Sequence, residues 1–352
     1  MKDSLTNFDV YVLARELSGA SRVSKIVRIP GGYKLKWRPV PDLLYIGGSL
    51  LIPTSYVIEA DRPDNLAIIS RKLLSNARVV AVEQLNFDRI LEIRTEKGSI
   101  IFELFSQGNV ILTDPEGTVV YATLQREWSS RTIRRGLPYQ TPPAPTLRPG
   151  IDFETFTSVL TGRDVVRSLV RGGIPPVYAE EVAHRAGVDP TAKIASLSDA
   201  DLRKIYDALL SVFHDLDHPK PTVYYSEDGG IEDITVFPVV RYSDLQAKSF
   251  PTLSEALDQI TPSILNTLQQ PTGQGKKRDR GDIVELWKRQ LEEARKELEQ
   301  LEEMINVAYA NSHLLLQAME LAKAGKEPPN SVGPFRLKSW GKKELVLEFT
   351  RQ

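Results

Sequence analysis

Residues 82–93 read VEQLNFDRILEI, a stretch in which β-branched and aliphatic residues alternate with polar ones. The alternation is typical of one short strand, and an adjacent pair of opposite charges, Asp88 and Arg89, stands in its middle. Neighbouring residues of a strand point to opposite faces, so both charges cannot face solvent if one face is core. We therefore expect one of them to be buried with a partner or to lie at a rim. The alternative is a surface ion pair or two solvated residues on a strand, worth roughly 0–1 kcal/mol.

The flanking segments predict an α+β fold that begins with an antiparallel sheet domain. An amphipathic helix is expected over residues 5–20, with Thr6 or Asn7 as its N-cap. A hairpin follows that turns at residues 30–32, Pro-Gly-Gly, and a second, basic helix is expected over 65–76. Further strands are expected at about residues 78–94, 99–105, 109–113 and 119–124.

Shifts in composition predict the domain boundaries. Residues 139–150 hold four prolines, which exclude a helix interior or a central strand and predict a linker. Residues 270–282 are polar and predict a second boundary. The predicted domains are the sheet domain over 1–150, a helical domain over 151–220, a β-hairpin with a connecting segment over 221–275, a long helix over 276–324 and the start of a further domain over 325–352.

The helical domain contains a candidate helix-hairpin-helix over residues 169–187, in which Gly172, Gly173 and Ile174 form the tight hairpin. Glycine N–H groups of such hairpins donate to nucleic-acid phosphates. Pro175 has no N–H, and the surrounding segment is acidic. A purely structural hairpin is therefore the other interpretation.

The long helix carries a narrow apolar seam. Apolar residues follow steps of three and four over residues 284–322, with only Ser312 polar in the register, and charged residues fill the other faces. This pattern favours a coiled coil over a helix packed on its own domain. Its partner helix is absent from the sequence, so we expect the seam to pair with a second copy of the chain. A hairpin is expected over 333–349.

Composition excludes several classes of protein and site. The chain has 352 residues, of which 41% are hydrophobic and 26% charged, which is typical of a soluble protein of several domains. It has no apolar run of membrane-spanning length, and its start lacks a signal-peptide pattern, so we expect a cytoplasmic protein without a membrane partner. It has no cysteine and four histidines, so no metal or cofactor is expected. His214 and His218 have ligand-like spacing, although a solvated helix end is the preferred interpretation.

Charge is unevenly distributed along the chain. Residues 1–150 hold 20 basic and 15 acidic residues, whereas residues 151–275 hold 10 and 18. A nucleic-acid surface is therefore expected mainly on the first part. Trp128 stands among four arginines there, a combination of charge and stacking surface that favours contact with RNA over a solvated loop. The candidate phosphate contacts are Arg71, Lys72, Arg126, Arg131, Arg134 and Arg135.

The order of the motifs resembles that of the NFACT family over almost the whole chain. The family opens with a Met-Lys start and a Phe-Asp-containing helix, then has a basic helix, a Gln before an Asp-Arg pair, an acidic strand with a Gly-Asn turn, and a proline-rich exit. The matching stretches are MKDSLTNFDV at 1–10, SRKLLSNARV at 70–79, QLNFDRI at 84–90, FELFSQGNV at 102–110 and RRGLPYQTPP at 134–143.

The resemblance implies a non-enzymatic factor of ribosome-associated quality control. Such a factor binds a large ribosomal subunit that still holds peptidyl-tRNA and recruits aminoacyl-tRNA, typically alanyl-tRNA, for template-free C-terminal tailing of the stalled chain. Asp88 and Arg89 match the family's essential tRNA-binding pair, and Glu103 and Leu104 match its second motif. Residues 105–107, Phe-Ser-Gln, depart from many relatives.

The resemblance also implies that the sequence is an N-terminal fragment. In the family a second helix closes the coiled coil after a middle domain, and a further RNA-binding domain follows. Neither is in this sequence, which is expected to end early in the middle domain.

Two other functions compete with this one. The layout of a sheet domain followed by a helix-hairpin-helix also resembles formamidopyrimidine-DNA glycosylases, which leaves a related nucleic-acid-binding protein without glycosylase activity as the alternative. Those enzymes need a proline amine after the initiator Met and usually a four-cysteine zinc finger, whereas this chain has Lys2 and no cysteine. A surface adhesin is disfavoured by the lack of a signal-peptide pattern.

Overall fold

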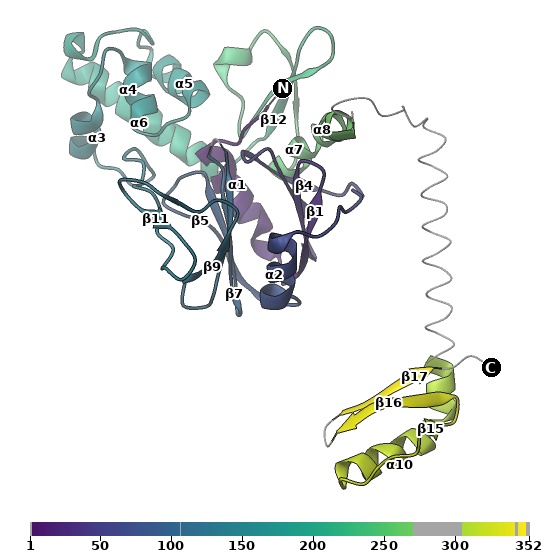
Figure 1. Ribbon diagram of the computed structural model, residues 1–352. Helices are drawn as coiled ribbons and strands as arrows, with labels where there is room; N and C mark the ends of the chain where they lie inside the picture. Colours follow the sequence, from purple (N-terminus) through teal and green to yellow (C-terminus); the bar gives the residue numbers. More distant parts are fainter. Residues whose placement is uncertain (1, 106, 270–304, 342–343, 350–352) are drawn as a thin grey trace, which may run out of the picture. The chain divides into compact units, whose positions relative to one another are not determined.

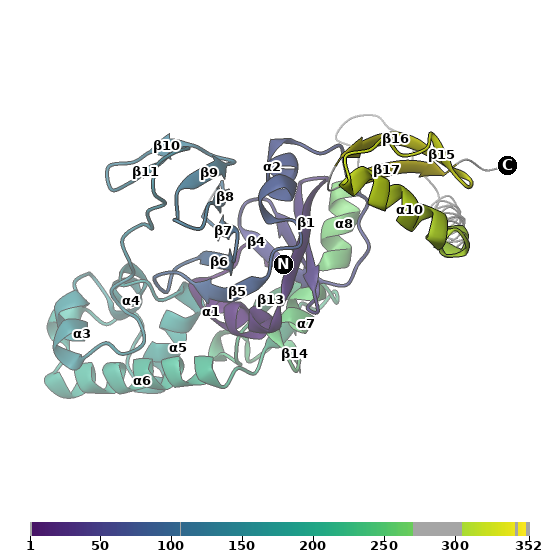
Figure 2. The same ribbon diagram turned by 90° about the horizontal axis from the view of Figure 1, so that it is seen from below.

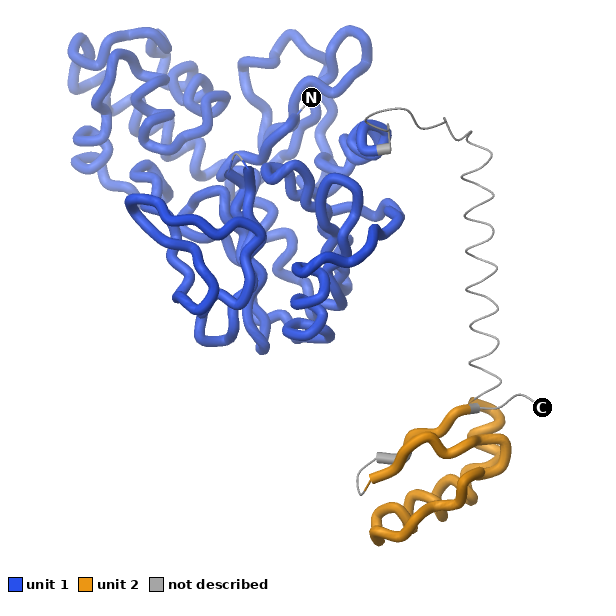
Figure 3. Tube along the Cα trace, viewed as in Figure 1, with its two compact units in different colours: residues 1–270 blue, residues 271–352 orange. Residues whose placement is uncertain are grey.

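The computed structural model forms two compact units, residues 1–270 and 271–352 (Figure 3). Helices and antiparallel sheets occur in both, which confirms the predicted α+β class. The predicted domain boundaries inside residues 1–270 stay a prediction, because one hydrophobic core runs through that unit from Leu5 to Ile264. The described residues are 2–105, 107–269, 305–341 and 344–349.

The first helix, α1 (Asn7–Glu16), begins where the sequence predicts. The side chain of Thr6 accepts a hydrogen bond from the Asp9 N–H, and the Asp9 carboxylate accepts one from the Thr6 N–H, so the two residues form a capping box. Asp9 is fully buried, and its Oδ2 lies 3.0 Å from the Nζ of Lys2. The N-terminus of α1 is therefore held rigidly in the core.

Two antiparallel sheets pack against α1 and share its core (Figure 1). The helix α2 (Asn65–Leu74) connects them and packs on the first strand. The sheets meet at an isolated bridge between Arg22 and Arg78. The first sheet contains β1 (Arg22–Ile29), β2 (Gly32–Arg38), β3 (Asp42–Ile46) and β4 (Leu50–Thr54). The second contains β5 (Val79–Gln84), β6 (Ile90–Thr95), β7 (Gly98–Glu103), β8 (Asn109–Thr113) and β9 (Val119–Ala122), and a short hairpin follows with β10 (Arg126–Glu127) and β11 (Thr132–Ile133).

The prediction of one strand over residues 82–93 is wrong, because the stretch is a hairpin. β5 ends at Gln84, β6 starts at Ile90, and the chain reverses between them. Asn86 and Phe87 both have positive φ angles, 55° and 56°, as in a type I′ turn. The Phe87 ring packs against the Phe8 ring at 5.7 Å between centroids, and this burial stabilises a backbone conformation that a bulky residue rarely adopts.

The rest of unit 1 places a group of helices at one side, away from β1–β4 (Figures 1 and 2). These helices are α3 (Phe153–Val159), α4 (Val165–Arg171), α5 (Pro176–Ala186) and α6 (Asp199–Asp217), with a 3-10 turn at Ile194–Ser196 before α6. Two further 3-10 turns of unit 1 lie elsewhere, at Leu17–Gly19 after α1 and at Val240–Tyr242. A third sheet has the order β13-β12-β14, and two helices close the unit. These elements are β12 (Thr222–Tyr225), β13 (Ile231–Thr235), β14 (Gln246–Ser249), α7 (Leu253–Asp258) and α8 (Thr261–Gln269). The β12–β13 hairpin was predicted, whereas β14 was not.

Unit 2 differs from the predicted uninterrupted seam. Residues 284–304 of that seam lie outside the described residues, and beyond them the helix breaks at Asn311 before α10 (Ser312–Lys323). One face of α10 packs against its own sheet, where Ala318 and Ala322 are buried. The predicted terminal hairpin is confirmed and gains a third strand. The strands are β15 (Ser331–Val332), β16 (Phe335–Gly341) and β17 (Glu344–Phe349).

Candidate functional site

The Asp88-Arg89 pair lies in the β5–β6 turn, at the end of the second sheet. The N–H of Asp88 donates to the Leu85 carbonyl, which closes the turn, and the Arg89 N–H donates to Asp88 Oδ1 at 2.7 Å. The Arg89 carbonyl accepts from the Leu104 N–H at 2.8 Å. The two matched motifs, Asp88-Arg89 and Glu103-Leu104, are therefore neighbours in space.

The turn meets the N-terminus of α1 and the α4–α5 hairpin. The side-chain amide of Asn7 donates to the Phe87 carbonyl at 3.2 Å and to the Gly173 carbonyl at 3.1 Å. The amide of Gln84 donates to the Asn7 carbonyl at 2.7 Å and to the Asp88 carbonyl at 2.8 Å. These four bonds fix three elements that are far apart in the sequence against one another. We call this group of residues the junction.

A cavity of about 380 Å³ opens at the junction, lined by Asp88, Arg89, Thr6, Gly173 and Pro175 among others. Burial raises the pKa of the Asp88 carboxyl above its usual value, and the Arg89 N–H only partly offsets this. Among the described residues the carboxylate accepts one hydrogen bond, from the Arg89 N–H, so it keeps further acceptor capacity. A half-buried carboxylate with spare capacity in a cleft is a candidate for ligand contact.

The Arg89 side chain has no ion pair among the described residues. Its guanidinium carbon lies 5.3 Å from the centroid of the Phe105 ring, a cation–π contact that holds the side chain at the rim. The sequence predicts that one member of the pair is buried with a partner or forms a rim. The structure places Asp88 and Arg89 half-buried at the edge of the cavity.

The α4–α5 hairpin offers little to a phosphate. The N–H groups of Gly172, Gly173 and Ile174 donate to the carbonyls of Ser168, Val170 and Leu169 respectively. A Cβ on Gly173, whose φ is 108°, would lie 2.4 Å from Pro145 Cβ, so the glycine is needed for close packing with the 139–150 linker. This arrangement favours the structural interpretation of the hairpin.

Glu103 is buried in an ion pair with Arg131. The guanidinium donates to both carboxylate oxygens, with Nη2 at 3.2 Å from Oε2, and the side chains are 3% and 7% exposed. The Tyr139 hydroxyl donates to the same carboxylate at 2.9 Å, and burial together with Glu103 raises the pKa of Tyr139. Leu104 is fully buried. Neither Glu103 nor Leu104 presents its side chain to the surface, and Arg131 differs from the exposed phosphate contact that we expected.

The other arginines of this segment remain accessible. Arg126, Arg134 and Arg135 are exposed and have no ion pair in the described part of the chain. Trp128 lies between two guanidinium groups, 5.7 Å from Arg126 and 5.0 Å from Arg131. A second cavity of about 370 Å³ is bounded by this indole, by Phe105 and by the Glu103 pair. Cationic, aromatic and acceptor groups thus converge beside Arg89.

The remaining predicted residues lie elsewhere. Arg71 and Lys72 are exposed on α2, at the bottom of unit 1 in Figure 1, whereas α4 and α5 lie at the top. His214 and His218 stack at 4.8 Å on the exposed end of α6. Among residues 2–105, 107–269, 305–341 and 344–349, no three His, Asp or Glu side chains form a group that could hold a metal ion. No described helix is long and apolar enough to cross a membrane.

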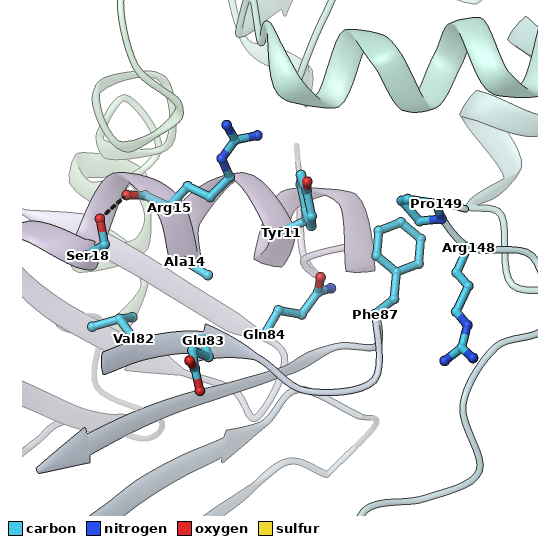
Figure 4. A pocket seen from close by; sticks show the side chains of 10 residues that line it. All are labelled: Tyr11, Ala14, Arg15, Ser18, Val82, Glu83, Gln84, Phe87, Arg148 and Pro149. Atoms are coloured by element: carbon cyan, nitrogen blue, oxygen red, sulfur yellow. Dashed lines mark hydrogen bonds between the residues drawn. The ribbon is translucent and has the colours of Figure 1, made fainter. Parts of the chain in front are cut away.

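A larger cavity of about 720 Å³ lies behind the turn, between α1, β5 and the linker (Figure 4). Phe87 lines it beside Tyr11, 5.8 Å away between ring centroids. The Tyr11 hydroxyl and the Arg15 guanidinium both donate to Asp217 Oδ1, at 2.9 and 2.6 Å, so these groups tie α1 to α6. Sequence reasoning selected Asn7 only as a possible N-cap and did not select Tyr139, because only long-range partners give them these roles.

A family model described as NFACT N-terminal and middle domains matches residues 53–321. The chain belongs to the NFACT family. A curated NFACT relative, the archaeal Rqc2 homolog aRqcH of Methanocaldococcus jannaschii, is 27% identical over an alignment of 358 residues that covers 93% of this chain and 53% of the relative. The chain therefore spans about half the length of that relative.

Solved structures share the NFACT fold seen here. The N-terminal part of the fibronectin/fibrinogen-binding protein from Streptococcus suis superposes with a TM-score of 0.58 at 21% identity, covering 74% of this chain and all of that one. The fibrinogen-binding protein from Staphylococcus aureus gives 0.54 at 17% identity, covering 72% and 99%. At these identities the likeness shows the fold alone.

Proposed function

We propose that the chain is the N-terminal part of a ribosome-associated quality-control factor that binds RNA without catalysing a reaction. In this function it engages an obstructed large ribosomal subunit that holds peptidyl-tRNA. It recruits aminoacyl-tRNA, typically alanyl-tRNA, for template-free tailing of the stalled chain. Membership of the NFACT family and similarity to an Rqc2 homolog support the proposal.

The observation that carries the proposal is the pairing of a free cation with a half-buried carboxylate on a rigid turn. Arg89 stands over Phe105 and makes no ion pair in the described residues, and Asp88 keeps acceptor capacity beside it. A guanidinium on an aromatic ring can bind phosphate or stack on a base, and a carboxylate accepts from a base edge or a ribose hydroxyl. The junction bonds of Asn7 and Gln84 keep both groups in place.

The neighbouring basic hairpin supplies the charge that an RNA backbone needs. We assign phosphate contacts to Arg126, Arg134 and Arg135, with Arg71 and Lys72 as a separate exposed pair on α2. Arg131 acts instead as the buried ion-pair partner of Glu103, and the two residues form part of the lining of the second cavity. Leu104 accordingly acts by positioning the Arg89 backbone through its N–H, and Glu103 acts through its contacts with Arg131 and Tyr139.

The test uses the full-length protein in a reconstituted tailing reaction on stalled large subunits. Asp88→Ala and Arg89→Ala should abolish the tail, measured by mass spectrometry of the released chain, while the thermal unfolding midpoint stays near that of the wild type. The control Arg94→Ala removes an exposed arginine that pairs with Glu83 on the same sheet, and it should tail normally. Normal tailing by both site variants would refute the assignment. Loss of tailing together with unfolding would make the pair structural.

A further inference from the structure

Five cations stand together where β1, β2 and β5 meet, at the far end of β5 from the Asp88-Arg89 turn. The backbone register places Arg22 directly opposite Arg38 on one side and opposite Arg78 on the other. Beyond the Val23–Trp37 pair and a register shift in β1, Lys25 lies directly opposite Lys36. Lys36 and Arg38 are two residues apart on the regular strand β2, so they share a face of the sheet.

Directly opposed like charges destabilise a sheet, yet this cluster has almost no compensation. One carboxylate among the described residues compensates part of this charge. Glu96 binds Arg78 at 3.3 Å, and the Arg78 N–H and guanidinium, with a smaller effect from the charge of Arg22, lower the pKa of its carboxyl. Arg22 donates to the carbonyl of Asn76. In the described stretches of the chain, no ion pair joins the other three cations to a carboxylate. These three are Lys25, Lys36 and Arg38, of which Lys36 is half-buried and the others are exposed.

Another lysine of β2, Lys34, is a buried residue with a carboxylate partner and serves as a comparison. Lys34 lies two residues before Lys36, is buried, and has its Nζ 3.3 Å from the Asp42 carboxylate. The fold therefore supplies an anion where a charge is buried and omits one where the cations reach solvent. An external anion is the partner that this pattern lacks.

Protection of an edge strand is the competing explanation. β1 is at the edge of its sheet, and charged side chains on edge strands discourage pairing with other chains. This protection accounts for Lys25. It does not apply to Arg22, which already pairs with Arg78 on its outer side. It does not account for Lys36 and Arg38, because β2 is an inner strand between β1 and β3.

We propose that Arg22, Lys25, Lys36 and Arg38 form a second binding surface for the phosphate backbone of RNA, separate from the Asp88-Arg89 site. A two-by-two array of long cationic side chains fits a ligand with repeated negative charges rather than a single anion. β5 runs six residues from this surface to the turn, about 20 Å, so one structured RNA can reach both. The inference rests on the proposed function, because it takes RNA to be the ligand.

The experiment compares charge reversals in the 352-residue chain by binding to a labelled RNA hairpin of arbitrary sequence over a range of salt concentrations. The variant Lys25→Glu/Lys36→Glu should bind more weakly, and the slope of log Kd against log salt should fall by about two. The control Lys193→Glu/Lys220→Glu makes the same change in net charge at two exposed positions. It should keep the wild-type slope.

A single substitution separates binding from folding. Lys36→Glu places opposite charges across from each other, so it should raise the unfolding midpoint by about one to three degrees while RNA binding weakens. Wild-type affinity and slope in the double variant, or equal weakening in the control, would overturn the second surface. Arg89→Ala, measured in parallel, separates the two proposals. Weaker RNA binding by Arg89→Ala alone would support the Asp88-Arg89 site and exclude the second surface. Weaker RNA binding by the lysine variants alone would support the second surface and count against the Asp88-Arg89 site.

Discussion

At the scale of single residues, Asp88 is a carboxylate whose position favours function over stability. Burial raises its pKa above the ordinary 3.8, so the folded state binds its proton more readily than the unfolded state does. The ionised carboxylate therefore lowers the free energy of unfolding. This destabilisation is absent below pH 3.8, grows as the pH rises towards the folded-state pKa, and is fully present at neutral pH. A neutral side chain of the same shape should relieve it.

Asp88→Asn is accordingly expected to unfold at a higher temperature than the wild type at pH 7. Asparagine keeps the Oδ1 that accepts from the Arg89 N–H, so the turn is preserved. The difference between the two proteins should shrink as the pH is lowered to 3. Calorimetric melts across this range measure it, with Glu127→Gln on the exposed β10 as the control. A variant less stable than the wild type at pH 7 would show that the charge is compensated.

Arg131 should behave as a structural residue. Arg131→Ala leaves the Glu103 carboxylate buried without its partner and should destabilise unit 1 by about 3–5 kcal/mol. Arg134→Ala, in an exposed arginine three residues on, should change stability by less than about 0.5 kcal/mol. Urea unfolding of both variants gives the comparison. Equal stabilities of the two variants would contradict the structural role of Arg131 and would again favour its assignment as an RNA contact.

At the scale of elements, periodicity and turn residues predict most of unit 1, and the misses have physical causes. α1, α2 and the hairpin at residues 30–32 follow from caps, apolar spacing and glycines near in sequence. The β5–β6 turn was missed because its left-handed residues are Asn86 and Phe87, and the Phe87 conformation depends on packing with Phe8, which is remote in sequence.

The site was only partly predictable for the same reason. Asp88 and Arg89 could be selected through the family resemblance, and the structure places them on a cavity. The burial of Arg131 depends on Glu103, 28 residues earlier, and the junction depends on Asn7 reaching Gly173. Such pairings leave no local signal in the sequence.

The α4–α5 hairpin gives a test at this scale. Gly173→Ala adds a Cβ at 2.4 Å from Pro145 and forces alanine to a φ of 108°, so it should disturb the junction and lower stability. Gly187→Ala is the matched control, because its φ is 64° and nothing lies near the added atom, which limits the cost to roughly 1–2 kcal/mol. Thermal melts should rank Gly173→Ala as clearly the more destabilising. The opposite order would contradict the packing role.

At the scale of the whole molecule, unit 2 presents apolar side chains on two of its helical segments. Ile305 and Tyr309 are 53% and 77% exposed, and Leu316 and Met319 on α10 are 60% and 42% exposed. Large exposed apolar side chains favour association in water. These exposed side chains still support the prediction that unit 2 pairs with a second copy, although one face of α10 packs against the sheet of its own unit.

Sedimentation velocity tests that pairing. We expect the 352-residue chain to sediment as a dimer at micromolar concentration, and a chain ending at Gln269 to sediment as a monomer. Leu316→Asp/Met319→Asp should shift the full sequence towards monomer. If the 352-residue chain and the shorter chain both sediment as monomers, unit 2 covers its apolar surface within one copy.

The most direct test of the central claim, that the Asp88-Arg89 turn recruits tRNA, is to sequence the tRNA that copurifies with the full-length protein on large ribosomal subunits. We predict that the wild type recovers an enriched tRNA, with alanine tRNA foremost, in addition to the peptidyl-tRNA. Arg89→Ala should recover large subunits in equal amount without that enrichment. Equal tRNA recovery by the wild type and Arg89→Ala, with subunits present in both, would contradict the claim.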